Sequence, residues 1–368
     1  MFIEKIEKEH LLNALQKIIG IVDRTRPLPI ISNVLIEKKG PDIRLITTDL
    51  EIQIETQIAN ANQSGPDTAI TTGAKKLQEI LRVLPEGSRT TLDIQENRLT
   101  IKANKSRFIL QTLPAQDFPK VTEQLNQAVK IQIQQKTLKK LLSMIQYAMA
   151  QQDIRYYLNG ILLAIEGDWL KLVATDGHRL AYVATRLDQE YSKREVILPR
   201  KTIHELIRIL SDTDEMMALE LADSQVRMTF SGSVMISKVI DGKFPDYERV
   251  IPKYSNQVIL NRSQVLQVLQ RIAILSNEKI RGARLVLTNQ NLSISSNNNE
   301  QEEALEEMEI DYHGPELDIG FNVNYLMDGL SNLDTETIIF SFGDSSSSVL
   351  ITIPENEEFK YVVMPMRI

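Results

Sequence analysis

A threefold repeat is the feature that most constrains this chain of 368 residues. Apolar residues recur at the spacing of one helix face in six segments. The first helical segments of the three copies begin about 126 residues apart. Runs of alternating residues, typical of strands, separate the two helices of each copy and also follow the second helix. Such a repeat predicts three similar domains. The predicted helices occupy residues 9–22, 74–87, 136–150, 200–212, 262–276 and 323–335.

A shared motif marks the ends of the first two copies. The segment "LPAQDFPKV" (113–121) matches "IDGKFPDYERV" (240–250) about 126 residues later. Polar stretches follow both, and we place domain boundaries near residues 124 and 254. We therefore expect an α+β fold in which every domain combines two helices with β-sheets. The predicted domains are 1–124, 125–253 and 254–368.

Composition narrows the classes of function. The chain has no cysteine and four scattered histidines, so thiolate chemistry, disulfides and a His-rich metal site are not expected. We accordingly expect no cofactor and no metal. The sequence contains no run of about 18 apolar residues, so we expect no membrane span. The segment "MFIEKIEKEH" lacks the apolar core of a signal peptide. These features favour a cytoplasmic protein.

The charge is unevenly distributed between helices and the rest of the chain. The helical segments carry a net charge of +7, whereas the whole chain carries −7, so the remainder carries −14. One interpretation is a shared helix face that attracts phosphate groups without reading sequence. Lysines that only keep helix surfaces soluble explain the same numbers equally well. The count covers residues 9–22, 74–84, 136–150, 200–210, 262–276 and 323–335.

The stretch "VATDGHRLAYV" (173–183) resembles an active site, because it places an acid, a titratable base and a cation within four positions. A hydrolase that uses Asp176 and His178 is therefore one hypothesis. However, the chain has no nucleophile motif, glycine-rich phosphate loop or metal-loop spacing. The Thr175–Asp176 pair also recurs as Thr48–Asp49 in the first copy, as a turn-forming element would. The recurrence favours a structural role for the pair.

Several motifs, in order along the whole chain, resemble the bacterial sliding clamp, the β subunit of the replicative DNA polymerase. The most specific are "QDIRYYLNG" (152–160), "ATDGHRLA" (174–181), "FPDYERV" (244–250), "AILSNEKIRGARL" (273–285), "IGFNVNYL" (319–326) and "YVVMPMRI" (361–368). The resemblance implies three repeated clamp domains per chain. It also implies a head-to-tail homodimeric ring, with helices lining the central hole. Such a clamp is a non-catalytic processivity factor that encircles duplex DNA and tethers proteins to it.

The resemblance also implies a hydrophobic pocket between domains 2 and 3 that receives short linear peptides. The implied partners are the replicative polymerase catalytic subunit, the clamp loader, other polymerases, and mismatch-repair and ligase-type proteins. Flexible methionines and rigid prolines suit a site that accepts many sequences. The pocket residues are Leu158, Thr175, Gly177, His178, Arg179, Leu180, Pro245, Arg249, Val250, Val362, Val363, Met364, Pro365, Met366 and Arg367.

Two further surfaces follow from the resemblance. Sequence-independent contact with duplex DNA is expected at Arg24, Arg26, Gln152, Tyr156 and Tyr157. The chain departs from the family at Ile368, where a leucine is common. A monomeric peptide-binding scaffold without DNA remains the alternative to a ring. The implied dimer interface comprises Lys76, Arg107, Phe108, Ile274, Leu275, Glu302, Glu303 and Glu306.

Overall fold

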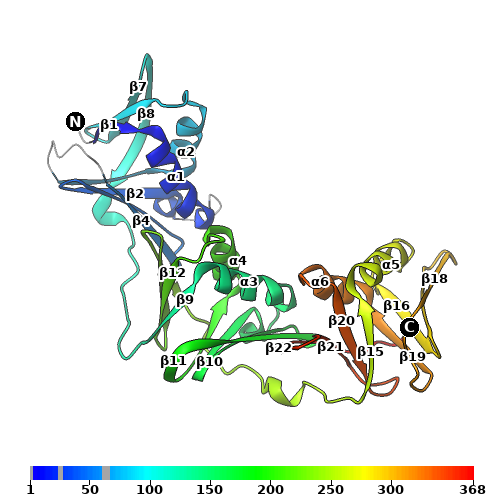
Figure 1. Cartoon of the computed structure of the whole chain (residues 1–368). Coiled ribbons are helices and arrows are strands. Elements are labelled where there is room, and N and C mark those ends of the chain that lie inside the picture. Colours follow the sequence, from blue (N-terminus) through cyan, green and yellow to red (C-terminus); the bar gives the residue numbers. More distant parts are fainter. Residues whose placement is uncertain (1–2, 24–27, 60–66) are drawn as a thin grey trace. The chain divides into compact units, whose positions relative to one another are not determined.

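A computed structural model of the chain describes residues 3–23, 28–59 and 67–368 (Figure 1). The chain forms two compact units. Unit 1 contains Met1–Lys136 and Arg208–Val239, and unit 2 contains Thr137–Ile207 and Ile240–Ile368. The predicted second domain therefore contributes to both units. The three-domain boundaries stay a prediction from the sequence repeat.

Unit 1 is built on one antiparallel sheet of twelve strands in which two repeat copies join. The joint is β4 against β14, where Ile54 pairs with Met235. This pairing explains why residues 208–239 associate with the first copy. The strands, in sheet order, are β1 (Ile3–Glu7), β6 (Arg89–Gln95), β7 (Arg98–Ala103), β8 (Ser106–Pro114), β5 (Thr68–Gly73), β2 (Asn33–Lys39), β3 (Asp42–Thr48), β4 (Ile52–Ala59), β14 (Ser233–Lys238), β13 (Gln225–Phe230), β12 (Met216–Leu221) and β9 (Val129–Gln134).

Helices α1 (Lys8–Ile18) and α2 (Ala74–Val83) pack on each other in unit 1. Leu11 and Leu15 of α1 and Leu81 of α2 are fully buried, at the helical spacing that predicted them. Each such side chain contributes about 1.5–3 kcal/mol of burial free energy.

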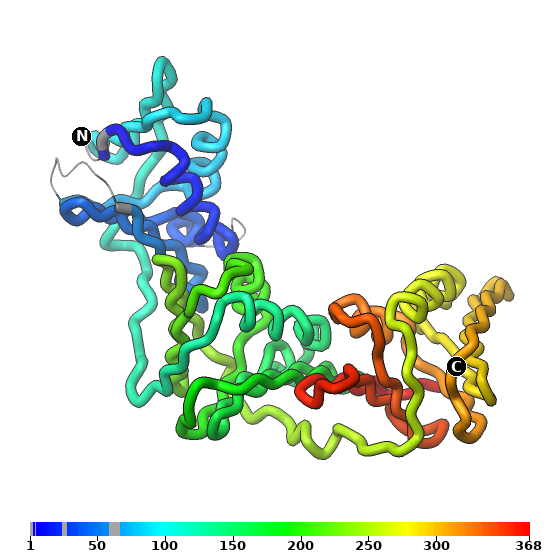
Figure 2. The backbone as a smooth tube through the Cα atoms, in the orientation of Figure 1, coloured from blue at the N-terminus to red at the C-terminus, as the bar shows by residue number. Residues whose placement is uncertain are grey.

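Unit 2 contains two antiparallel sheets. The six-stranded sheet joins the second and third copies through β11 and β22, where Leu180 pairs with Val362. Figure 2 shows the two segments side by side in unit 2, β11 in green and the chain's last strand in red. The six-stranded sheet runs β10 (Gly160–Thr175), β11 (Arg179–Pro199), β22 (Asn356–Val363), β21 (Val349–Ile353), β20 (Thr337–Phe342) and β15 (Asn256–Asn261). The four-stranded sheet runs β18 (Glu303–Glu309), β17 (Asn291–Asn297), β16 (Gly282–Thr288) and β19 (Leu317–Asn322).

The remaining helices are α3 (Gln135–Ile145), α4 (Arg200–Ile209), α5 (Arg262–Ile274) and α6 (Val323–Ser331). Asn261 and Asn322 cap α5 and α6, since each side chain accepts a backbone N–H of the first turn. All six predicted helices are confirmed. All six end earlier than predicted. Helices α1 and α3 pass into short 3-10 turns at Ile19–Ile21 and Gln146–Ala148.

Candidate functional site

The turn at residues 175–179 joins β10 to β11 and is held by its own side chains. Thr175 Oγ1 donates to the carbonyl of Arg179 (2.6 Å) and accepts from the N–H of Gly177 (3.1 Å). Asp176 Oδ1 accepts from the backbone N–H groups of His178 (2.9 Å) and Arg179 (3.0 Å). Gly177 has a φ of +90°, which glycine adopts without the steric cost of a Cβ.

The same turn is present at residues 48–52 of the first copy. Thr48 Oγ1 donates to the carbonyl of Ile52 (2.9 Å), and Asp49 Oδ1 accepts from the N–H groups of Glu51 (3.0 Å) and Ile52 (2.8 Å). One turn geometry therefore explains both Thr-Asp pairs. The carboxylate of Asp176 organises the turn, and this structural role is enough to explain an aspartate at position 176 without acid-base catalysis.

Arg179 distinguishes the second turn from the first, where Ile52 occupies its position. The Arg179 side chain is only 10% exposed. Its Nε donates to Asp176 Oδ2 (3.1 Å), and its two terminal nitrogens donate to Asp328 Oδ2 and to the carbonyl of Tyr147, both at 2.6 Å. The guanidinium carbon also lies 4.3 Å from the ring centroid of Tyr325. Arg179 thus fastens the turn to α6 instead of projecting toward a ligand.

These contacts shift the ionisation of the groups involved. Burial disfavours the charged form of Arg179, but Tyr361 and Asp328 more than offset that effect and raise the pKa of Arg179. Burial raises the pKa of the Tyr361 hydroxyl above its ordinary value, against the opposing effect of Arg179. The cluster therefore has a fixed cation paired with carboxylates and neutral phenols.

A pocket of about 200 Å³ lies beside the turn. Leu158 and Leu180 form its buried part, since they are 2% and 3% exposed. Val250, which is 45% exposed, and Pro245 form its exposed part. The lining is largely apolar and has room for one or two side chains. The complete lining is Arg155, Tyr157, Leu158, Thr175, Gly177, Leu180, Pro245, Tyr247 and Val250.

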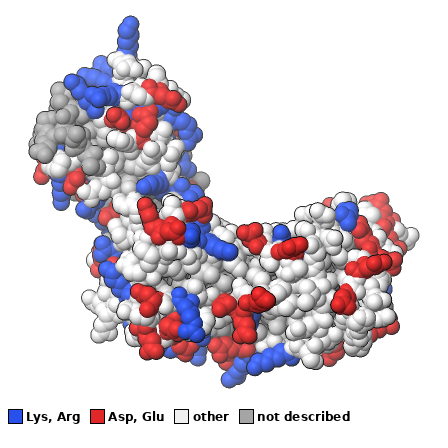
Figure 3. Space-filling model, in the orientation of Figure 1, with Lys and Arg blue, Asp and Glu red and all other residues white. Residues whose placement is uncertain are grey.

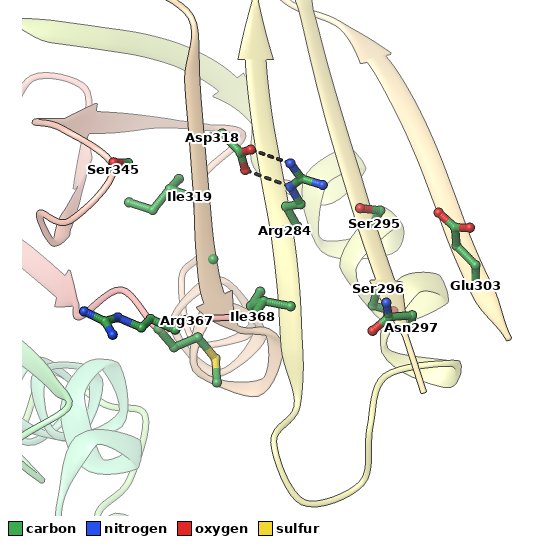
Figure 4. Close-up of a pocket in the computed structure, with 12 residues that line it drawn as sticks. Arg284, Ser295, Ser296, Asn297, Glu303, Asp318, Ile319, Ser345, Arg367 and Ile368 are labelled. Carbon is green, nitrogen blue, oxygen red and sulfur yellow. Dashed lines mark hydrogen bonds and ion pairs between the residues drawn. The ribbon is translucent and has the colours of Figure 1, made fainter. Parts of the chain in front are cut away.

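The segment 364–368, here called the tail, continues from β22. The Met364 N–H donates to the carbonyl of His178 (2.9 Å), which brings the tail to the turn as predicted. The Met366 N–H donates to the carbonyl of Gly320 on β19 (2.8 Å). Beyond it, the tail lines a separate hollow of about 700 Å³ against the four-stranded sheet (Figure 4).

Ten of the fifteen predicted pocket residues fall into three groups. Leu158, Thr175, Gly177, Leu180, Pro245 and Val250 line the pocket itself. Val362 and Val363 are buried in the sheet, where they pair with Leu180 and Arg179 of β11 next to the turn. Met366 and Arg367 line the second hollow.

Arg249 has an 87% exposed side chain that pairs with Asp246 at 2.7 Å. The sequence prediction missed Arg155 and Tyr247 as lining residues and assigned Tyr157 to DNA only. All three lie inside quoted motifs, so the motifs themselves were the available signal.

Comparison with known proteins decides the family. Models of the N-terminal, central and C-terminal domains of the DNA polymerase III beta subunit match residues 1–122, 132–246 and 248–367. The chain belongs to the DNA polymerase III beta subunit family.

The similarity to individual members of the beta sliding clamp family extends over the whole chain. The chain is 44% identical to the beta sliding clamp of Pseudomonas aeruginosa and 40% identical to that of Escherichia coli, with 99% of each chain covered in both comparisons. A crystal structure of the Pseudomonas aeruginosa DNA polymerase III subunit beta has a TM-score of 0.96 at 43% identity, covering 99% of this chain and 100% of that one. The Caulobacter crescentus pol III beta structure has a TM-score of 0.92 at 34% identity, with the same coverage.

Membership of the beta sliding clamp family settles the class of function. The chain is a DNA sliding clamp, a non-catalytic processivity factor of DNA replication that tethers its polymerase to DNA. The enzyme hypothesis for Asp176 and His178 is therefore wrong.

The loop that follows α3 carries three residues predicted to touch DNA. Asp153 and Arg155 pair within it, with Arg155 Nη2 at 2.9 Å from Asp153 Oδ2. Asn159 ties the loop to its base by accepting from the N–H of Asp153 (2.9 Å). Gln152 and Tyr156 are exposed beside this rigid turn, and Tyr157 is half-buried in the pocket lining. Arg24 and Arg26 lie outside the described residues.

The predicted dimer residues are distributed over both units. Phe108, on β8 in unit 1, is half-buried, and Ile274, at the end of α5 in unit 2, is 76% exposed. Glu306 already pairs with Arg271 of the same chain through two hydrogen bonds, whereas Glu302 and Glu303 are exposed. Figure 3 shows acidic side chains gathered at the end of unit 2 where β18 lies.

Among residues 3–23, 28–59 and 67–368, no group of three or more His, Asp or Glu side chains has a geometry that could hold a metal ion. In the same part of the chain, no helix is long and apolar enough to cross a membrane.

Proposed function

We propose that the pocket beside turn 175–179 binds the short linear peptides through which partner proteins attach to this clamp. The observation that carries the proposal is an apolar pocket whose polar turn is already satisfied internally. Since Thr175 and Asp176 saturate the turn's own N–H groups, the pocket offers apolar surface without unpaired backbone donors from this turn. A leucine or phenylalanine fits that chemistry and a pocket of about 200 Å³.

The tail supplies a second wall of the proposed peptide site. Met364 is 45% exposed, and its own backbone N–H donates to the carbonyl of His178. A methionine side chain adapts to different apolar partners. We infer that a glutamine of the peptide lies toward Pro365 and Met366 while its Leu/Phe pair enters between Leu180 and Val250. Peptides of this kind reach micromolar affinity after ordering costs are subtracted.

The proposed partners are the replicative polymerase catalytic subunit, the clamp loader, and other polymerases, mismatch-repair and ligase-type proteins. Fluorescence anisotropy with a labelled peptide carrying a Gln and a Leu-Phe pair tests the assignment. Binding that Leu180→Asp abolishes supports it. Binding that the substitution leaves unchanged would exclude this pocket.

Two strand edges support a head-to-tail homodimer. β18 pairs only with β17 among the described strands, so its other edge is open, and it carries four glutamates within seven residues. In unit 1, residues 106–111 of β8 pair with β7 alone among the described strands, because β5 meets β8 only from Thr112 onward. Arg107 lies on this second edge, close in sequence to Lys105.

An acidic open edge and a basic open edge on one chain are complementary to each other and not to themselves. Such a contact is heterologous, so it must close into a ring to avoid a filament. We infer a dimeric ring with helices lining the hole, in the bacterial cytoplasm. The apolar centre of the proposed subunit interface comprises Phe108, Ile274 and Leu275. Around it, Lys76 and Arg107 face Glu302, Glu303 and Glu306.

The proposed DNA contacts are few and sequence-independent. Gln152, Tyr156 and Tyr157, with Arg24 or Arg26, are the candidate residues. Among the described helices, each one except α6 carries net positive charge, which favours phosphate without reading bases.

A further inference from the structure

The tail is attached to the rest of unit 2 at two hydrogen-bonded points. Met364 bonds to the carbonyl of His178 at the turn, and Met366 bonds to the carbonyl of Gly320 on β19. Pro365 lies between them and has no N–H to donate. The tail therefore runs as an extended strap from the proposed peptide site to the face of the four-stranded sheet.

Two glycines leave room for the Ile368 side chain at the end of the strap. A Cβ on Gly320 would lie 2.5 Å from Ile368 Cδ1 and 2.6 Å from the carbonyl oxygen of Met366. A Cβ on Gly282, in the neighbouring strand β16, would lie 3.3 Å from Ile368 Cδ1. Neither glycine has a positive φ, so backbone conformation does not explain its presence. Close approach of the tail does explain it.

An ion pair links the two strands that carry these glycines. Arg284 pairs with Asp318 across β16 and β19, with Nε at 2.8 Å from Oδ1. In Figure 4 the Ile368 side chain lies over these strands, whereas Arg367 extends away from them. Ile368 is nevertheless 59% exposed. The contact is thus a shallow one, suited to positioning a segment rather than to stabilising the fold.

We propose that Gly282 and Gly320 form a receptor for the Ile368 side chain, and that this contact holds the tail where it forms one wall of the peptide site. The role rests on the proposed peptide-binding function. A segment that is ordered before binding loses less conformational freedom when a ligand arrives. Ile368 and Gly320 are therefore positioning residues that act through Met364 and Met366 and need not touch the peptide.

The test compares Ile368→Ala and Gly320→Ala with wild-type protein in two measurements. Hydrogen-exchange mass spectrometry follows the segment 361–368, and anisotropy follows the peptide with a Gln and a Leu-Phe pair. Both variants should speed exchange of the tail and raise the peptide Kd about 3- to 10-fold. The double variant should be no weaker than the weaker single one, because both remove one contact.

Three matched variants separate anchoring from general damage. Ile368→Leu keeps an apolar side chain of the same size and should retain wild-type exchange and affinity. Gly282→Ala should have a smaller effect than Gly320→Ala, since its Cβ would be less crowded. Ser345→Ala alters the same hollow without touching the glycines and should have none. The thermal midpoint should be unchanged throughout.

Two results would overturn the proposal. One is tail exchange in Ile368→Ala that equals the wild-type rate, because Ile368 would then anchor nothing. The other is faster exchange with an unchanged peptide Kd, because the anchor would then not serve the site. Wild-type protein that binds no peptide would instead refute the proposed function, and the exchange measurement would still decide whether the anchor exists.

Discussion

Arg179 shows at the scale of a residue how one position changes the meaning of a repeated turn. Both turns use the same threonine and aspartate bonds, but only the second places a guanidinium between Asp176 and Asp328. The sequence predicted the turn from its recurrence. It could not predict the role of Arg179, because Asp328 lies 149 positions away and its pairing depends on the folded position of α6.

Replacing Arg179 should therefore destabilise unit 2. Arg179→Ala leaves Asp328 and the carbonyl of Tyr147 without their donor, and we expect a loss of about 1–3 kcal/mol in the free energy of unfolding. Arg179→Lys should restore only part of the lost free energy of unfolding, since an ammonium cannot reproduce the forked geometry of a guanidinium. Differential scanning calorimetry measures the change in thermal midpoint.

His178→Ala is the matched control for the same turn. The His178 side chain is exposed, whereas its backbone N–H donates to Asp176 and its carbonyl accepts from Met364. Alanine keeps those bonds, so stability should change by less than about 0.5 kcal/mol and peptide affinity only slightly. Equal thermal midpoints for the Arg179→Ala and His178→Ala variants would contradict the anchoring role of Arg179.

Asp153 gives a prediction in pH. Hydrogen bonds from the side chain and backbone of Arg155 lower the pKa of Asp153 from 3.8 to about 2. Because the folded pKa is the lower one, the stabilisation of this loop is complete above the unfolded value and is lost as pH falls through about 2. A ¹³C-carboxyl titration of labelled aspartate should give a midpoint near that value. A midpoint near 4 would mean that the Asp153–Arg155 pair does not form in solution.

At the scale of elements, the helices were predictable and the pairing of strands was not. Each helix begins within about one residue of the predicted start, because the apolar period and the caps are local signals. The pairings of β4 with β14 and of β11 with β22 join different copies. An alternating strand pattern specifies which face is buried but not which strand lies beside it. The resemblance, not the period, therefore predicted that the tail meets the turn.

Removing the tail tests the element that completes the proposed peptide site. Deletion of residues 364–368 removes Met364 and the strap but leaves β22, which ends at Val363, intact. Peptide binding should fall by more than about tenfold while the thermal midpoint and the dimer persist. Anisotropy and sedimentation velocity measure the two effects. Loss of the dimer together with peptide binding would show that the tail serves assembly instead.

At the scale of the whole molecule, the proposed ring depends on the two open strand edges. Ile274→Ala combined with Leu275→Ala removes apolar side chains worth about 1.5–3 kcal/mol each when fully buried, while exposed ion pairs contribute only about 0–1 kcal/mol. The double variant should therefore be a monomer at low micromolar concentration in sedimentation velocity. Its peptide affinity should be unchanged, since the pocket lies elsewhere in unit 2. A variant that remains dimeric would move the interface away from these residues.

Ring closure predicts a form of DNA binding that a groove or a sequence-reading surface cannot produce. A closed ring loaded on circular duplex is held by topology, so it should stay bound at salt concentrations that abolish binding to short linear duplex. For the short duplex, log Kd should rise linearly with log salt in proportion to the few phosphates neutralised. Cutting the circle with a restriction enzyme should release the protein, because the ring then slides off the ends. The Ile274→Ala, Leu275→Ala monomer should show no salt-resistant binding to either form. Retention on the cut DNA, or an affinity that depends strongly on base sequence, would contradict a sliding ring and favour a surface that binds DNA without encircling it.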